Sequence, residues 1–159
     1  MLRVYLGLVA LIVASGSYGI ERSAPSSTPE LHIHEIHARD SIDVTLSPAN
    51  RGITRIWRPG NSWGATNWRV LVVRGANLIL FREDPDQRFS RNSPLFDELQ
   101  EPKTIPLNLN SELWIGPKAE FGAFHSGDKV IVVYDVPVTG EARQFGVWYG
   151  TISAMVPVN

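Results

Sequence analysis

The chain of 159 residues contains no cysteine. This absence excludes disulfide bridges, thiol nucleophiles, thiolate metal sites and cysteine-based redox chemistry. An Asn-x-Ser/Thr acceptor is also missing, so N-glycosylation is not expected. A stable fold must therefore come from apolar packing, and a chain of this length can bury a sufficient core as one domain.

Apolar runs near membrane-spanning length are missing beyond the N-terminus. Residues 4–14 are apolar, follow Arg3 and precede a short segment rich in small residues, a pattern typical of a secretory signal peptide. The run is shorter than the roughly 20 apolar residues that cross a bilayer. We expect residues 1–19 to be a signal peptide and the mature protein to be secreted and extracellular; the alternative is an N-terminal membrane anchor. Residues 20–30, rich in Ser, Pro and Thr, are expected to form a flexible leader before a single domain at 31–159.

Motifs for several classes of function are absent as well. The net charge is −1, and no basic stripe is interleaved with stacking aromatics, which argues against nucleic-acid binding. The sequence has no Gly-x-Ser-x-Gly elbow and no glycine loop suited to a phosphate. We therefore expect a non-enzymatic protein without a required cofactor.

Short apolar segments recur at intervals of about ten residues and are separated by turn residues. This pattern predicts an all-β fold, an antiparallel β-sandwich of about eight strands. Expected strand segments include 31–37, 41–46, 53–57, 103–109, 119–124 and 129–136. At most one short helix is expected, near residues 94–100, because Ser93 suits a helix cap and Pro94 the first helical position.

The stretch 68–81 is the expected centre of the sheet. Two apolar runs, 70–73 and 78–81, are joined by Arg-Gly-Ala-Asn, a composition that favours the tight turn of a hairpin. Their continuous apolar character predicts strands that are covered on both faces.

Arginine is concentrated in the middle of the chain: eight of the twelve arginines lie between Arg51 and Arg91. Arginine presents a planar fork that binds carboxylate and phosphate, so one arginine-rich face would suit anionic lipid, sulfated glycan or an acidic partner. The alternative is that these arginines pair with acidic residues of neighbouring strands.

Two loops supply the candidate ligand-binding residues. Trp63 lies between Ser62 and Gly64 in a loop rich in turn residues. An exposed tryptophan there would stack on a sugar ring or lie among membrane headgroups; alternatively, it folds over the end of the sandwich as a plug. The candidate set is Trp63, Arg58 and Asn61 from this loop, with Arg82, Arg88 and Arg91 from the polar segment 82–93.

Three of the four histidines, His32, His34 and His37, lie within six residues. On a strand His32 and His34 point the same way, and His37 points to the other side unless the strand bulges. Imidazoles on one face bind Zn²⁺ or Cu²⁺ when a neighbour such as His125 or Asp40 adds a third ligand. The alternative is a solvated edge strand that holds no ion.

The second half of the chain resembles the closing strands of a C2 domain. The resemblance is carried by Asn108 to Trp114, Asp128 to Asp135, the pair Phe145-Gly146 and Gly150-Thr151-Ile152, and Trp68 to Leu78 is similar to an earlier strand of that family. It implies calcium-loop candidates Asp84, Asp86 and Asp135. Calcium-binding members carry a further Asp where this chain has Pro137, and Ca²⁺ needs six to eight oxygen ligands. The resemblance therefore implies a calcium-independent or degenerate member that docks on lipid or protein.

Three functions follow as expectations. The first is a secreted binding module that uses its sandwich-end loops on membrane lipid, glycan or a partner protein. The second is a small secreted metal-binding protein built on His32, His34 and His37. The third is a secreted effector or toxin-like protein that binds one protein target. In each case a monomer is expected.

Overall fold

A computed structural model describes residues 28–37, 40–48, 53–86 and 93–159. The expected signal peptide and most of the expected leader lie outside these residues. Glu30, the last residue of that leader, already belongs to the first strand.

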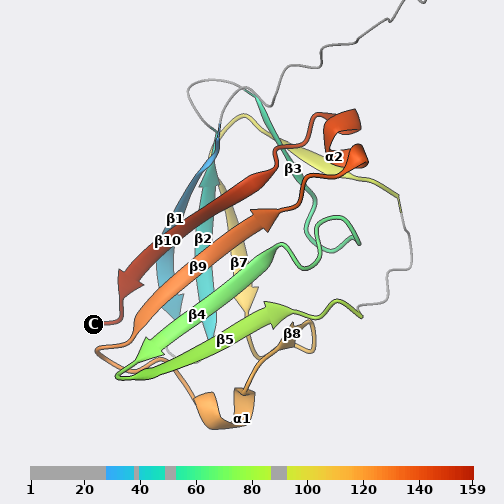
Figure 1. The fold of residues 1–159 in the computed structure, drawn as a ribbon. Coiled ribbons are helices and arrows are strands. Elements are labelled where there is room, and N and C mark those ends of the chain that lie inside the picture. Colours follow the sequence, from blue (N-terminus) through green and yellow to red (C-terminus); the bar gives the residue numbers. More distant parts are fainter. Residues whose placement is uncertain (1–27, 38–39, 49–52, 87–92) are drawn as a thin grey trace, which may run out of the picture.

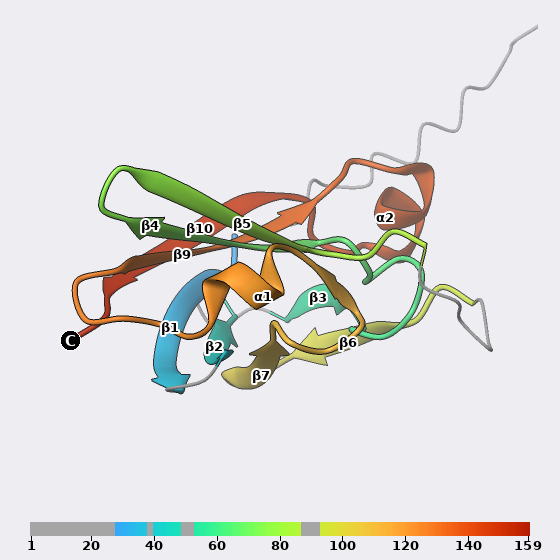
Figure 2. The ribbon, with the colours of Figure 1, turned by 90° about the horizontal axis from the view of Figure 1, so that it is seen from below.

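Two layers of antiparallel sheet pack face to face (Figures 1 and 2). One layer is a five-stranded sheet in the order β10 (Gly150–Pro157), β9 (Lys129–Val136), β4 (Trp68–Arg74), β5 (Asn77–Glu83) and β8 (Trp114–Ile115). The other layer contains a three-stranded sheet, β1 (Glu30–His37), β2 (Ser41–Ser47) and β7 (Lys103–Asn108), and a two-stranded sheet, β3 (Thr54–Trp57) and β6 (Phe96–Leu99). The all-β sandwich predicted from the sequence is confirmed.

The core lies between the layers and follows the two-residue period of the strands. Val70 and Val72 of β4 face inward beside Val130 and Val132 of β9, and all four are fully buried. The opposite layer contributes alternate residues of β2, namely Ile42, Val44 and Leu46. Burying each such side chain contributes about 1.5–3 kcal/mol, which is how the fold is stabilised without disulfides.

The hairpin expected at 68–81 is confirmed: β4 and β5 pair from Arg69 opposite Arg82 to Arg74 opposite Asn77. Gly75 has a φ of 58° at the first position of the two-residue turn, where a type II′ turn requires glycine. The expectation that both faces are covered is wrong. Outward-facing Leu78 and Leu80 are 63% and 45% exposed, because no other element packs over this side of the described sheet.

The prediction of a helix near residues 94–100 is also wrong, because Phe96–Leu99 forms strand β6. Strand β3 offers an unpaired edge, and cross-strand pairing places Arg55 opposite Glu98, where the two form an ion pair. These long-range interactions override the local helix-capping pattern.

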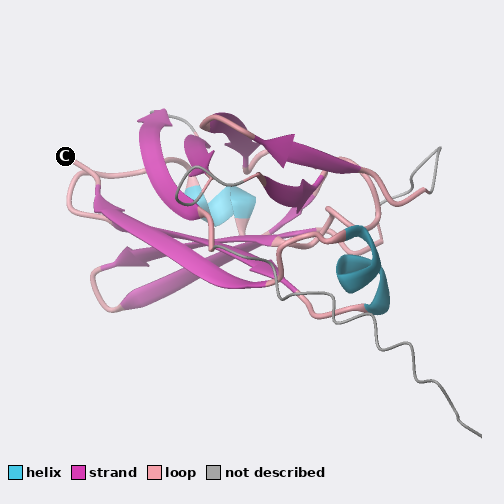
Figure 3. Ribbon diagram, turned by 90° about the horizontal axis from the view of Figure 1, so that it is seen from above, coloured by secondary structure: helices cyan, strands magenta, loops and turns pink. Residues whose placement is uncertain are grey.

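Two short helices form elsewhere, at opposite ends of the sandwich (Figures 1 and 3). Helix α1 (Lys118–Phe121) replaces the strand expected at 119–124, and α2 (Gly140–Phe145) begins after Thr139, whose hydroxyl accepts the Ala142 N–H. No helix in the described part of the chain has the length and apolar composition needed to cross a membrane.

Candidate functional site

The loop that carries Trp63 is held together by Asn61. The Asn61 Nδ2 donates to the Leu95 carbonyl (3.1 Å), and its Oδ1 accepts from the N–H groups of Trp63 (3.0 Å) and Gly64 (2.9 Å). A Cβ at Gly64 would lie 2.1 Å from the Arg58 carbonyl oxygen, so only glycine fits there. Asn61 is 4% exposed. Its side-chain polar atoms are bound within the fold, which disfavours the ligand contact expected from the sequence.

Trp63 packs against the core and is half-buried. Its ring centroid lies 6.2 Å from that of Trp57. This packing against the core favours the plug alternative, and ligand binding by the exposed part of the ring stays a prediction.

Several arginines of the central region pair with acids in or beside other strands. Arg58 Nε lies 2.8 Å from Asp97 Oδ1, and equivalent ion pairs join Arg55 to Glu98, Arg69 to Asp135 and Arg74 to Asp128. For these four arginines the structure confirms the pairing alternative. Arg88 and Arg91 lie outside the described residues.

The calcium-loop candidates are not brought together. Asp84 Oδ1 accepts the N–H of Asp86 in a local turn, whereas Asp135 on β9 binds Arg69 and accepts a hydrogen bond from Thr151. Within the described ranges none of the three belongs to a group of ligand atoms close enough to share one ion.

The histidines separate in the structure. His32 contacts Glu30, with 3.5 Å between Nε2 and Oε2, and His34 is an exposed residue of β1. His125 lies in the connection between α1 and β9, and its backbone N–H binds Asp128. Only His37 joins a group of potential metal ligands in the described residues, with Glu35 and Asp43.

A half-buried carboxylate that the sequence did not single out, Glu83, lies at the end of β5. The Glu83 Oε2 accepts the Trp68 N–H at 3.1 Å, and the N–H groups of Thr66 and Asn67 also contribute. Burial raises the pKa of Glu83 to about 7, although these backbone hydrogen bonds oppose the shift. Thr66 has a φ of 69°, an unusual conformation for a non-glycine residue, and the carboxylate holds this turn in place.

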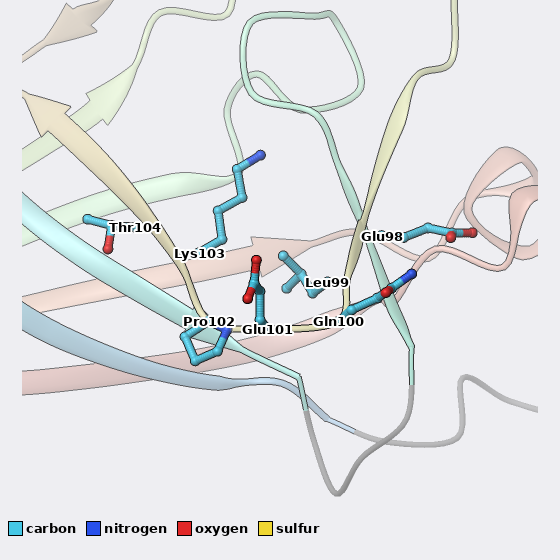
Figure 4. Close-up of a pocket in the computed structure, with 7 residues that line it drawn as sticks. All are labelled: Glu98, Leu99, Gln100, Glu101, Pro102, Lys103 and Thr104. Carbon is cyan, nitrogen blue, oxygen red and sulfur yellow. The ribbon is translucent and has the colours of Figure 1, made fainter.

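A depression of about 460 Å³ lies beside the turn between β6 and β7 (Figure 4). Its lining includes Glu98, Glu101 and Lys103, and their charged ends do not converge on one point in Figure 4. Lys103 Nζ is already bound to Asp97. The depression therefore offers no set of groups arranged for catalysis or for holding a small molecule.

The outer surface of the five-stranded sheet is different, because aliphatic side chains lie on every strand. We call it the apolar sheet face; its apolar members are Leu71, Val73, Leu78, Leu80, Ile115, Ile131, Val133 and Met155. Figure 1 views this face from the front, and in Figure 2 no helix or strand lies over it.

Strand pairing organises this face in rows. One row crosses four strands, since Met155 opposes Ile131, Ile131 opposes Leu71, and Leu71 opposes Leu80. Met155 at the end of the row is 63% exposed. Contiguous exposed apolar surfaces on folded domains are often interaction sites, so this face is a candidate for one.

Cations border the apolar row on both sides. Lys129 lies on one side, and Arg69 and Arg82 lie directly opposite each other on the other side. Like charges at directly opposed positions destabilise a sheet. Asp135 compensates Arg69, whereas Arg82 and Lys129 have no ion-pair partner among the described residues. The face thus has three cations against one carboxylate.

Comparisons of the chain with protein-family models, with curated proteins and with solved structures find no match. The C2 resemblance therefore stays an expectation from the sequence.

Proposed function

We propose that this protein is a secreted, non-enzymatic binding domain that docks a partner protein through the apolar sheet face. The observation that carries the proposal is the apolar row from Met155 to Leu80, whose two end residues are exposed. It is bordered by Arg82 and Lys129, which have no ion-pair partner among the described residues. The partner presents an apolar surface with acidic side chains around it. This proposal moves the binding surface from the sandwich-end loops to the sheet.

The chemistry of the face favours a protein over the other ligands. Sugar rings stack on aromatic side chains, and the outward positions of these five strands hold no aromatic residue. Membrane anchoring relies on interfacial Trp or Tyr residues and gains about 1 kcal/mol per basic residue. This face carries a net of only two positive charges, so it is poorly suited to bind a membrane. An aliphatic surface that includes methionine matches the centre of a protein–protein interface. A second copy fits poorly, because two positive faces would meet.

Photo-crosslinking tests the proposal. A photoreactive amino acid is placed at Leu80, on the apolar sheet face, and in a matched control at Thr104, an exposed position on the opposite sheet. Each protein is incubated with proteins secreted by the source cells. We expect one protein to crosslink at position 80 and not at position 104. This crosslink is expected to disappear when Met155 is replaced by glutamate.

Two further measurements separate the other occupants. Analytical ultracentrifugation is expected to show a monomer, and co-sedimentation with vesicles rich in phosphatidylserine is expected to show no binding. A dimer that dissociates in Leu80→Glu would assign this face to a second copy of the chain. Vesicle binding that is abolished in Leu80→Glu would assign it to a membrane. Equal crosslinking at positions 80 and 104 would remove the face from consideration.

A further inference from the structure

Strand β1 contains a β-bulge at His34. In the pairing with β2, Ile33 opposes Val44 and the next paired residue, Glu35, opposes Asp43, so His34 is the extra residue. A bulge shifts the two-residue alternation of side chains by one position.

Beyond the bulge, Ile36 packs against the core, while Glu35 and His37 lie on the outer surface of the three-stranded sheet. Without the extra residue, the alternation that turns Leu31 inward would also turn Glu35 and His37 inward. The bulge therefore brings a histidine and a glutamate beside Asp43, which extends from the same surface of β2.

The three side chains are close together. His37 Nε2 lies 3.2 Å from Asp43 Oδ2, and His37 Nδ1 lies 3.6 Å from Glu35 Oε1. One ligand atom from each residue can be chosen so that all lie within 4.8 Å of one another. Bonds of about 2.0–2.2 Å to one ion hold neighbouring ligand atoms about 3.0–3.6 Å apart. Because the two short distances involve different ring nitrogens of His37, the side chains must rotate so that one nitrogen and both carboxylates face the same ion.

We propose that Glu35, His37 and Asp43 form a binding site for a divalent transition-metal ion, with water completing the coordination. Two carboxylates favour a divalent cation, and an imidazole nitrogen favours Zn²⁺, Cu²⁺ or Ni²⁺ over Ca²⁺ and Mg²⁺. The Glu35, His37 and Asp43 side chains are 59%, 43% and 27% exposed, so an ion can enter and leave from solvent.

This ligand set differs from the one expected from the sequence. It keeps His37 and replaces the other three histidines with carboxylates, because the bulge changes which neighbours His37 meets. The site lies on the layer opposite the apolar sheet face, so it does not depend on the proposed docking function. The competing arrangement is an ion pair in which a protonated His37 bridges the two carboxylates and no metal binds.

Calorimetric titration of the untagged, purified protein with ZnCl₂ distinguishes the metal site from the ion pair without metal. Wild type is expected to bind one Zn²⁺ per chain. His37→Ala and Asp43→Asn are each expected to weaken binding at least about tenfold, since a lost ligand costs more than 1.4 kcal/mol. His32→Ala and His125→Ala are the matched controls, because both remove an exposed histidine outside the site, and both are expected to bind like wild type.

A thermal unfolding series gives a second readout. Zn²⁺ that binds only the folded state raises the unfolding temperature of wild type and of both controls, and a chelator reverses the rise. His37→Ala is expected to show no rise, with circular dichroism confirming that it is folded. Three results would each overturn the proposal. They are unchanged Zn²⁺ affinity in His37→Ala, loss of binding in His32→Ala, and no saturable binding to wild type below about 1 mM Zn²⁺.

Discussion

The side chain of Asn61 makes three hydrogen bonds to backbone groups and is almost fully buried. From the sequence, an asparagine beside an arginine and a tryptophan suited a ligand equally well, because the same amide groups bind a sugar or a turn. The same holds for Arg58 and Trp63, because the sequence does not show that they contact Asp97 and Trp57 in the fold. Predictions for single residues depend on neighbours that the sequence does not reveal.

Replacing Asn61 with alanine tests its role in the loop. The variant leaves the N–H groups of Trp63 and Gly64 without their acceptor, so we expect a loss of about 2–4 kcal/mol in the free energy of unfolding. Urea denaturation measures the loss. Asn110→Ala, at an exposed asparagine, is the control and is expected to change stability by less than about 0.5 kcal/mol. Similar values for the two variants would show that Asn61 does not hold the loop.

Glu83 is expected to make stability depend on pH. Its carboxyl has a pKa of about 7 in the folded state and 4.5 as its ordinary value, so between these values the folded state binds the extra proton. The contribution of Glu83 to the free energy of unfolding is therefore largest below pH 4.5, and it is lost as the pH rises through 7. The shift corresponds to about 3 kcal/mol at 1.36 kcal/mol per pH unit.

The measurement is the difference in free energy of unfolding between wild type and Glu83→Gln at several pH values. We expect wild type to lose stability relative to the variant between about pH 4.5 and 7, because glutamine stays neutral. Parallel curves for the two proteins over this range would show that Glu83 is ionised without penalty in the folded state.

Among the elements, strands with a clear two-residue alternation were predicted well and those defined by their partners were not. Strand β2 alternates inward and outward residues along its whole length, so its place in a half-buried sheet could be inferred locally. Strand β6 has only four residues and depends on its pairing with β3, which begins more than 40 residues earlier. The bulge at His34 likewise depends on the register of β1 against β2, although the sequence indicated that a bulge would change the side on which His37 lies.

The β4–β5 hairpin is tied to the rest of the fold by Arg74. Its guanidinium donates three hydrogen bonds to Asp128 and one each to the carbonyls of Phe121 and Ala123. Asp128 is 2% exposed, and the hydrogen bonds from Arg74 lower its pKa. This pair fastens the hairpin to the connection that follows α1.

Arg74→Ala is expected to lower the free energy of unfolding by about 3–5 kcal/mol, because it leaves the buried Asp128 carboxylate without its partner. Arg69→Ala breaks the exposed ion pair with Asp135 and is expected to cost less than about 1 kcal/mol. Urea denaturation of both variants gives the comparison. Equal losses would mean that burial does not distinguish the two pairs.

For the whole molecule, composition and periodicity were enough to predict a cysteine-free β-sandwich. That no described element covers the central hairpin could not be predicted, because the apolar sequence of a strand is the same whether a helix, a partner or solvent lies against it. Leu71 and Leu80 looked like core residues in the sequence and belong to the apolar sheet face in the structure. The candidate interaction surface was therefore visible only after the strands had been placed.

The most direct test is the dissociation constant of the crosslinked partner, measured for wild type, Leu80→Glu and Thr104→Glu. A charge buried in the apolar row is expected to weaken binding at least about tenfold, or 1.4 kcal/mol. Thr104→Glu, which places the same charge on the opposite sheet, is expected to bind like wild type. Equal affinity of wild type and Leu80→Glu would contradict docking through this face.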